Sequence, residues 1–135
     1  MLGLPTTSLP NPDYVGTVVD TKRGVVELRV NREAGRATSV LFVARDFELQ
    51  CDDGSTPSQS FNAREAEFSG RTSFDAFTAR LGGYYRIHGQ LVGQKRARGF
   101  LIYYEDPSDP PGSTMEAECS TVGGKQRWVA ERVGE

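Results

Sequence analysis

The sequence predicts an all-β protein, an antiparallel β-barrel or β-sandwich of about eight to ten strands with an internal pseudo-repeat. Apolar residues recur at every second position in many short stretches, and no stretch shows a convincing helical period. Val, Thr, Tyr and Phe are common in these stretches, and 15 Gly and 7 Pro supply turns between them. The 135 residues are enough for one domain with a sizeable core.

The first half reads as an extended tail followed by strands. Residues 1–13 carry three prolines among small polar residues, which is typical of an extended N-terminal tail. Alternating patterns then predict strands at residues 14–19, 26–30, 38–44, 47–51 and about 61–68. Arg45-Asp46 interrupts an apolar run, and we expect a bulge or bend there. The polar stretch 52–60 is expected to be a loop.

The second half continues the same pattern. Strands are predicted around residues 74–78, 84–91, 95–104, 115–119 and 126–133. Gly82-Gly83 and Gly93-Gln94 mark turns between them. The stretch 106–112 holds three prolines, which remove backbone donors and fix φ, so it is expected to be a loop. Residues 14–133 therefore read as a single β domain.

The two halves of this domain, about 14–68 and 84–133, echo one another. Four pairs of segments match in the same order: Tyr14-x-Gly16 with Tyr85-x-x-x-Gly89, 24–30 with 99–105, Cys51-x-x-Gly54 with Cys119 and its following glycines, and Phe61-x-Ala63 with Trp128-x-Ala130. Self-similarity in a fixed order indicates one structural unit used twice.

Charge and hydropathy exclude several classes. Lys and Arg number 16 against 18 Asp and Glu, a net charge of −2, which argues against nucleic acid as the partner. No apolar run approaches the roughly 20 residues that span a bilayer. The N-terminus lacks the basic and apolar regions of a signal peptide. We therefore expect either a cytoplasmic protein or an exported one, extracellular or in the cell envelope, whose signal peptide has been removed, and we favour export.

Cys51 and Cys119 occupy matching places in the two halves. They predict either a disulfide in an oxidising compartment or two separate buried thiols. A disulfide closing a loop of this length would stabilise the fold by about 4 kcal/mol in the chain-entropy model. Two cysteines and a single histidine do not make a closed zinc site, so no metal and no cofactor is predicted.

Six motifs together resemble a known family: Tyr14-Val-Gly16, Cys51-Asp-Asp-Gly54, Thr72-Ser-Phe74, Tyr85-Arg-Ile87-His-Gly89, Ala97-Arg-Gly99-Phe-Leu101 and Trp128-Val-Ala130-Glu-Arg132. The chain is similar, over about residues 14–133, to a family of small exported bacterial proteins that are frequent in actinobacteria. The resemblance implies an exported domain and a disulfide, and it brings no established activity. Ser73 and the apolar outer face of the later strand depart from the family pattern.

The predicted strand at 95–104 is apolar on both faces. If its odd-numbered residues from 97 to 103 face the core, the opposite face carries Arg98, Phe100, Ile102 and Tyr104. Such a face must be covered by another part of the chain or must bind something. We therefore predict a non-enzymatic binding or structural module with this contact face for a protein partner or for self-association.

Two other functions stay open. A β-barrel lined by Tyr14, Tyr85, Tyr103 and Trp128 would carry a small apolar ligand in its interior. A hydrolase would use the single histidine, His88, with a nearby carboxylate, although an outward, solvated histidine explains the same pattern. No phosphate loop, nucleophile elbow or zinc helix motif is present, so no catalytic residue is assigned.

A local basic cluster accompanies the turn at Gly93-Gln94. It consists of Lys95, Arg96 and Arg98 with Arg86. These cations could hold a phosphate, a sulfated glycan or an acidic surface. The alternative is that they protect a strand edge from pairing with other chains.

Overall fold

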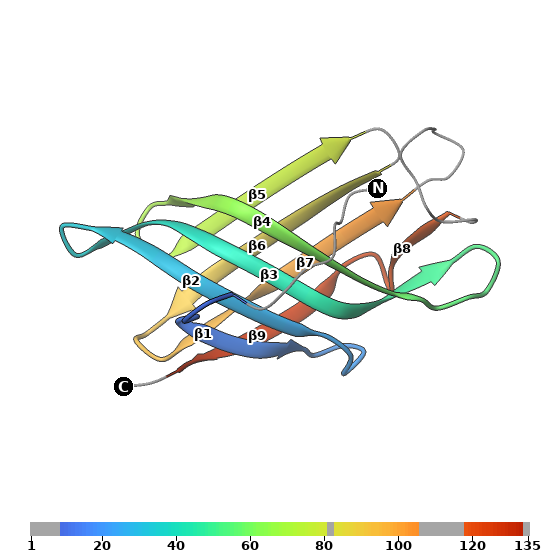
Figure 1. The fold of residues 1–135 in the computed structure, drawn as a ribbon, viewed down its shortest axis with the longest axis horizontal. Coiled ribbons are helices and arrows are strands. Elements are labelled where there is room, and N and C mark those ends of the chain that lie inside the picture. The colour runs from blue at the N-terminus through green and yellow to red at the C-terminus, as the bar shows by residue number, and fades with distance from the viewer. Residues whose placement is uncertain (1–8, 81–82, 106–117, 134–135) are drawn as a thin grey trace.

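The computed structural model describes residues 9–80, 83–105 and 118–133. These residues form nine β-strands and no helix, which confirms the all-β class (Figure 1). The strands are β1 (Tyr14–Val18), β2 (Val25–Glu33), β3 (Arg36–Cys51), β4 (Ser58–Ser69), β5 (Ser73–Arg80), β6 (Gly83–Val92), β7 (Arg96–Glu105), β8 (Cys119–Thr121) and β9 (Gln126–Arg132).

The strands form one antiparallel sheet that closes on itself. Its order is β2-β1-β9-β7-β6-β5-β4-β3, and β3 pairs back with β2. The short strand β8 fills the remaining space between the ends of β3 and β7. A single sheet whose first and last strands pair is a barrel, so the structure decides between the two predicted architectures.

The interruption predicted at Arg45-Asp46 is a bend inside one strand. Asp46 has a positive φ of 60°, and the pairing of β3 with β4 shifts register between Ala44 and Phe47. Before the bend β3 pairs with β2, and after it β3 pairs with β8. The separately predicted strands at 38–44 and 47–51 are therefore one strand that changes partner at a bulge.

Two other strand boundaries concern residues 58–60 and 115–119. β4 begins at Ser58, inside the stretch predicted as a loop, because Ser58 and Gln59 pair with β3 beyond its bend. Of the strand predicted at 115–119, residues 115–117 lie outside the described residues. Cys119 begins β8.

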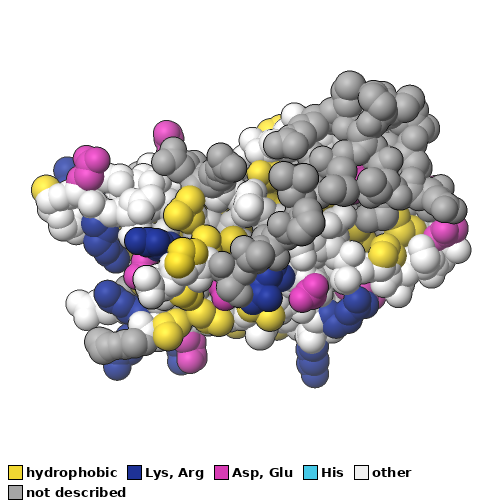
Figure 2. Space-filling model, in the orientation of Figure 1, with side chains coloured by type: hydrophobic (Ala, Val, Ile, Leu, Met, Phe, Trp, Pro, Cys, Tyr) yellow, Lys and Arg dark blue, Asp and Glu magenta, His cyan; other side chains and the backbone are white. Residues whose placement is uncertain are grey.

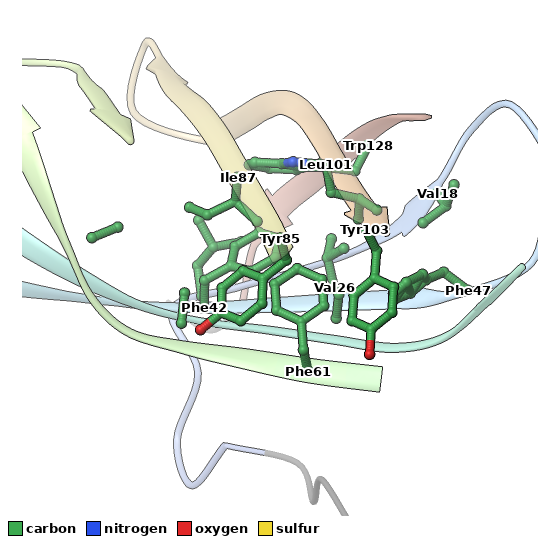
Figure 3. Packing of buried hydrophobic residues seen from close by; sticks show 14 of the residues in the cluster. Val18, Val26, Phe42, Phe47, Phe61, Tyr85, Ile87, Leu101, Tyr103 and Trp128 are labelled. Atoms are coloured by element: carbon green, nitrogen blue, oxygen red, sulfur yellow. The ribbon is translucent and has the colours of Figure 1, made fainter. Parts of the chain in front are cut away.

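Aromatic rings fill the barrel interior. Figure 3 shows Tyr85, Phe61, Tyr103 and Phe47 in one row. Phe61 contacts the other three rings of this row and also Phe42. Its ring centroid lies 4.3 Å from that of Tyr85, 5.5 Å from Phe47, 5.9 Å from Tyr103 and 6.2 Å from Phe42. Trp128 extends the cluster, 5.3 Å from Phe42 and 6.3 Å from Phe74. Such tilted and offset pairs add to the stabilisation that burial of the rings provides.

Two glycines allow close packing inside the barrel, Gly89 against the Phe74 ring and Gly99 against the backbone of β6. Gly89 lies opposite Phe74, and Gly99 lies opposite Trp128, in adjacent strand pairs. A Cβ atom at Gly89 would stand 2.2 Å from Cζ of Phe74, and one at Gly99 would stand 1.8 Å from the carbonyl oxygen of His88. These positions require glycine because the space of a side chain is already occupied.

The junction between β4 and β5 has the fewest paired residues of the ring. These strands pair only at their hairpin end, from Glu67↔Asp75 to Ser69↔Ser73. Further along, the Tyr85 hydroxyl donates to the carbonyl oxygen of Asn62 at 2.9 Å. This side-chain bond from β6 to β4, with the stack on Phe61, connects the two sides where strand pairing is lacking.

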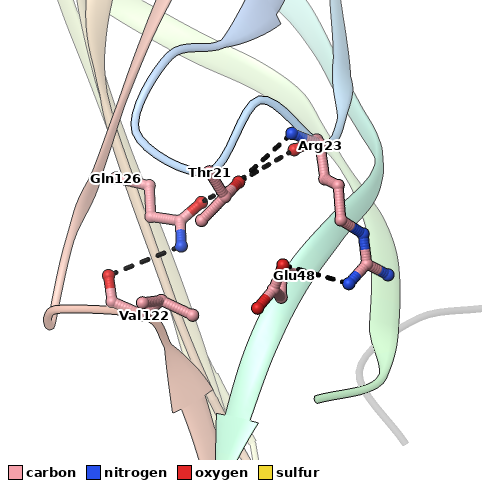
Figure 4. A network of polar contacts seen from close by, with 5 residues as sticks. All are labelled: Thr21, Arg23, Glu48, Val122 and Gln126. Atoms are coloured by element: carbon pink, nitrogen blue, oxygen red, sulfur yellow. Dashed lines mark hydrogen bonds and ion pairs between the residues drawn. The ribbon is translucent and has the colours of Figure 1, made fainter.

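Polar contacts tie together three segments at one end of the barrel (Figure 4). The Thr21 hydroxyl donates to Oε1 of Gln126 at 3.4 Å, and Nε2 of Gln126 donates to the carbonyl of Val122 at 3.4 Å. Arg23 forms an ion pair with Glu48 of β3 at 3.0 Å. Gln126 is fully buried, so its two bonds satisfy an amide that would otherwise be costly to bury.

The described end of the N-terminal tail packs on the outer side of β2. The Leu9 amide donates to Oε1 of Glu27 at 3.0 Å, and Oδ2 of Asp13 accepts from the Val30 amide at 2.6 Å. Glu27 and its cross-strand neighbour Val43 are both buried.

On the face drawn in Figure 2, basic and acidic side chains are interspersed around a band of hydrophobic ones.

Candidate functional site

The predicted contact face lies on the outer side of β7. Burial alternates along this strand, with Ala97, Leu101 and Tyr103 inside. Arg98, Phe100, Ile102 and Tyr104 point outward, in positions opposite β6 residues of the same face. The face therefore continues across β6 onto β5, and on its other side onto β9.

One end of this outer face is an aromatic stripe, formed by Phe77 of β5, Tyr84 of β6 and Tyr104 of β7 with Ile102 beside them. The ring centroids of Phe77 and Tyr84 are 5.7 Å apart, and those of Tyr84 and Tyr104 are 5.4 Å apart. Phe77 is 61% exposed. The Tyr104 hydroxyl donates to the carboxylate of Glu118.

A hollow of about 640 Å³ lies next to the aromatic stripe. It is lined by Asp75, Ala76, Phe77, Tyr84, Arg86 and Ile102. Asp75 and Arg86 form a bidentate ion pair at 2.8 and 3.2 Å, so the two charges in the hollow balance. A mostly apolar, charge-balanced surface of this kind suits contact with another protein.

His88 lies beside this ion pair and against an aromatic ring. Its Nδ1 lies 3.6 Å from Oδ2 of Asp75, and its ring stacks on Phe100 with 5.3 Å between centroids. Hydrogen bonds from Arg86 hold the pKa of the Asp75 carboxyl below its usual value. The hydrolase hypothesis pairs His88 with a nearby carboxylate, and Asp75 is the carboxylate that lies beside it.

The Asp75 ion pair predicts a pH-dependent contribution to stability. A folded-state pKa below the unfolded one stabilises the fold above the unfolded pKa, and this stabilisation is lost as pH falls through the folded pKa. Asp75→Asn should therefore lower the free energy of unfolding at about pH 6.5 by less than about 1 kcal/mol, because the pair is exposed. The difference between the two proteins should shrink as the pH is lowered from about 6.5 toward about 2.5.

Urea unfolding of both proteins at the two pH values measures this difference. Asp52→Asn serves as the control, because among the described residues the Asp52 side chain has no ion pair or hydrogen bond. A difference between Asp75→Asn and the unmodified protein that stays constant with pH would show that the ion pair is not its source.

The other end of the outer face is a basic groove, about 470 Å³ in volume, along β6, β7 and β9. It is lined by His88, Arg98, Phe100, Lys125, Arg127 and Val129, with Val19, Gln90 and backbone at its margins. Of the predicted basic cluster, Arg98 lines this groove, whereas Arg86 pairs with Asp75 and Arg96 lies opposite Glu131. These three arginines of the predicted cluster therefore do not form one binding site in the structure.

The four residues predicted to line a ligand cavity are all buried. Tyr14, Tyr103 and Trp128 are at most 2% exposed, and Tyr85 is 6% exposed. Tyr103 donates to Oε1 of Glu105 at 2.8 Å, and burial together with this carboxylate raises the pKa of its hydroxyl. Other aromatic rings pack against Tyr85, Tyr103 and Trp128 in the interior. The Trp128 Nε1 atom has no hydrogen-bond partner among the described residues.

Cys51 and Cys119 form a disulfide, as predicted. They stand directly opposite each other in the pairing of β3 with β8. The bond therefore fixes β8 against the end of β3, and Glu105 of β7 pairs with Cys119 from the other side. A disulfide is typical of proteins from oxidising compartments.

The described residues show no group of three or more His, Cys, Asp or Glu side chains that could hold a metal ion. Asp53, near Cys51, accepts hydrogen bonds from the amide and hydroxyl of Ser55 at 2.9 and 2.6 Å. These bonds lower the pKa of Asp53 and belong to a turn.

No helix in the described part of the chain is long and apolar enough to cross a membrane.

Sequence reasoning missed several residues of the outer face. Phe77 lies in a predicted strand, but its exposure of 61% depends on how distant segments pack around β5. Lys125 lies between the strands predicted at 115–119 and 126–133, yet its Nζ atom lies 4.8 Å from the centroid of Phe100. No local pattern places a turn residue over a ring 25 positions away.

The chain was compared with family models, curated proteins and solved structures. No protein-family model matches the chain. No curated protein and no solved structure matches it.

Proposed function

We propose that the protein is a non-enzymatic binding or structural module of the cell envelope or exterior, and that it associates with a second copy of itself through the aromatic stripe. The observation that carries this proposal is the aromatic stripe, in which Phe77 is 61% and Tyr84 is 36% exposed, beside the balanced ion pair of Asp75 and Arg86. The Cys51–Cys119 disulfide supports an exported location.

The charge pattern favours a second copy as the partner. The hollow beside the stripe carries one carboxylate and one guanidinium, so two copies meeting there bring no net like charge together. In a two-fold contact, Asp75 of one copy and Arg86 of the other can also exchange partners. Aromatic residues and Arg are enriched in the cores of such interfaces.

Substitution of the stripe tests self-association directly. Ile102→Asp and Phe77→Asp are each expected to weaken the dimer by at least about 30-fold, because each places an uncompensated charge in the apolar contact of both copies. Sedimentation equilibrium over a wide concentration range measures the dissociation constant. Neither side chain belongs to the buried core, so folding should be retained.

Val133→Asp is the matched control, since Val133 is 50% exposed and lies outside the stripe. It should associate like the unmodified protein. A protein that stays monomeric at all concentrations, or equal weakening by Val133→Asp, would exclude the proposed contact.

A further inference from the structure

We propose that the basic groove binds a small organic anion, with a carboxylate, sulfonate or phosphate group carried on a flat apolar body. This goes beyond the proposed self-association and uses the opposite end of the outer face, on β7 and β9. The groove combines three features that such a ligand requires: unbalanced positive charge, an exposed apolar surface and a size suited to a small molecule.

The positive charge comes from Arg98 and Lys125. No carboxylate of the described residues lies within ion-pair distance of either side chain, and no Asp or Glu lines the groove. Arg127, in contrast, is held by Asp20 at 2.8 Å. In a chain of net charge −2, two unpaired cations beside one hollow are a local excess that an anion would balance.

The apolar surface comes from Phe100, Val129 and Val19. Val129 is 46% exposed and Val19 is 37% exposed. Phe100 is held between neighbours, with the His88 ring stacked 5.3 Å away and Lys125 Nζ 4.8 Å from its centroid. A flat apolar body can cover these side chains while its anionic group meets the Arg98 guanidinium and the Lys125 ammonium.

Size and surroundings favour a compact anion over a long polyanion. A volume of about 470 Å³ falls within the range of small-molecule sites. The carboxylates of Asp75 and Asp20 flank the groove along the row that runs through His88, Phe100 and Arg127. A nucleic acid or acidic polysaccharide lying along this row would meet both carboxylates, whereas a small ligand fits between them.

Titration with naphthalene-2-sulfonate, followed by calorimetry at low ionic strength, tests the proposal. We expect saturable binding with one site per chain, weakened by added salt. The double substitution Arg98→Gln/Lys125→Gln should weaken this binding by at least about tenfold, because two charge-assisted contacts are lost. Naphthalene-2-methanol, which has the flat body without the charge, and sodium sulfate, which has the charge without the body, should each bind more weakly than the sulfonate.

The double substitution Arg32→Gln/Arg36→Gln is the control. It removes the same charge from the exposed hairpin of β2 and β3, where neither Arg32 nor Arg36 has an ion pair among the described residues. This variant should keep the affinity of the unmodified protein. Equal loss in both variants, or undiminished binding by Arg98→Gln/Lys125→Gln, would overturn the proposal.

The outcome is separable from the self-association test. Ile102 does not line the groove, so Ile102→Asp should bind naphthalene-2-sulfonate with unchanged affinity. A protein that is always monomeric yet binds the probe through Arg98 and Lys125 would exclude the dimer alone. A dimer that binds no probe would exclude the anion site alone.

Discussion

Phe61→Ala is expected to lower the free energy of unfolding by about 3–5 kcal/mol, one of the two largest effects that we predict. Phe61 is 1% exposed and its ring contacts four other rings from three strands besides its own. Alanine would leave a cavity at the point where these rings meet. The stack that supports Tyr85 across the junction of β4 and β5 would also be lost.

Denaturant unfolding of Phe61→Ala and Phe77→Ala measures this effect against a matched control. Both substitutions remove a phenyl ring from a strand, but Phe77 is 61% exposed and its loss should change stability by about 0.5 kcal/mol or less. Equal destabilisation by the two variants would contradict the assignment of Phe61 as the centre of the core.

Loss of the disulfide is expected to cost about 2–4 kcal/mol. The bond joins residues 68 positions apart and holds the three-residue strand β8 in place between β3 and β7. Reduction would enlarge the conformational freedom of the unfolded chain and loosen this end of the barrel. The midpoint of urea unfolding should therefore fall when a reductant is added.

The variant Cys51→Ala/Cys119→Ala separates the disulfide from other effects of the reductant. Alanine avoids placing a hydroxyl at these buried positions, and the variant should unfold at the same urea concentration with or without reductant. Thiol titration of the unmodified protein should find no free thiol before reduction. Full reduction without any change in the midpoint would contradict a stabilising role for the bond.

Local patterns were sufficient for the strand class and for the orientation of side chains within a strand. Alternation along 96–105 predicted which β7 residues point outward, because successive side chains of any strand point to opposite faces. The polar pair Arg45-Asp46 in an apolar run predicted the bend of β3 for a similarly local reason. The matching places of the two cysteines predicted either a disulfide or two buried thiols, and the structure shows the disulfide.

Which polar and aromatic residues are buried, and which side chains surround them, depended on contacts between distant segments. Glu27, Glu105 and Gln126 are polar residues in ordinary strand patterns, and only their neighbours in the closed barrel show that they are buried. The surroundings of the predicted ligand lining depend on such contacts too. Tyr85 and Trp128 do face the interior, but the rings that occupy the space beside them come from other strands.

The sequence by itself therefore determined the strand class, the bend of β3 and the outward set Arg98, Phe100, Ile102 and Tyr104, because these depend on the alternation of neighbouring residues. Only the tertiary structure decided that the sheet closes into a barrel and that the outer face divides into an aromatic stripe and a basic groove. The pairing of β2 with β3 and the approach of Lys125 to Phe100 decide these features. Such contacts form between residues far apart in the chain, and the sequence around each residue carries no direct record of its partner.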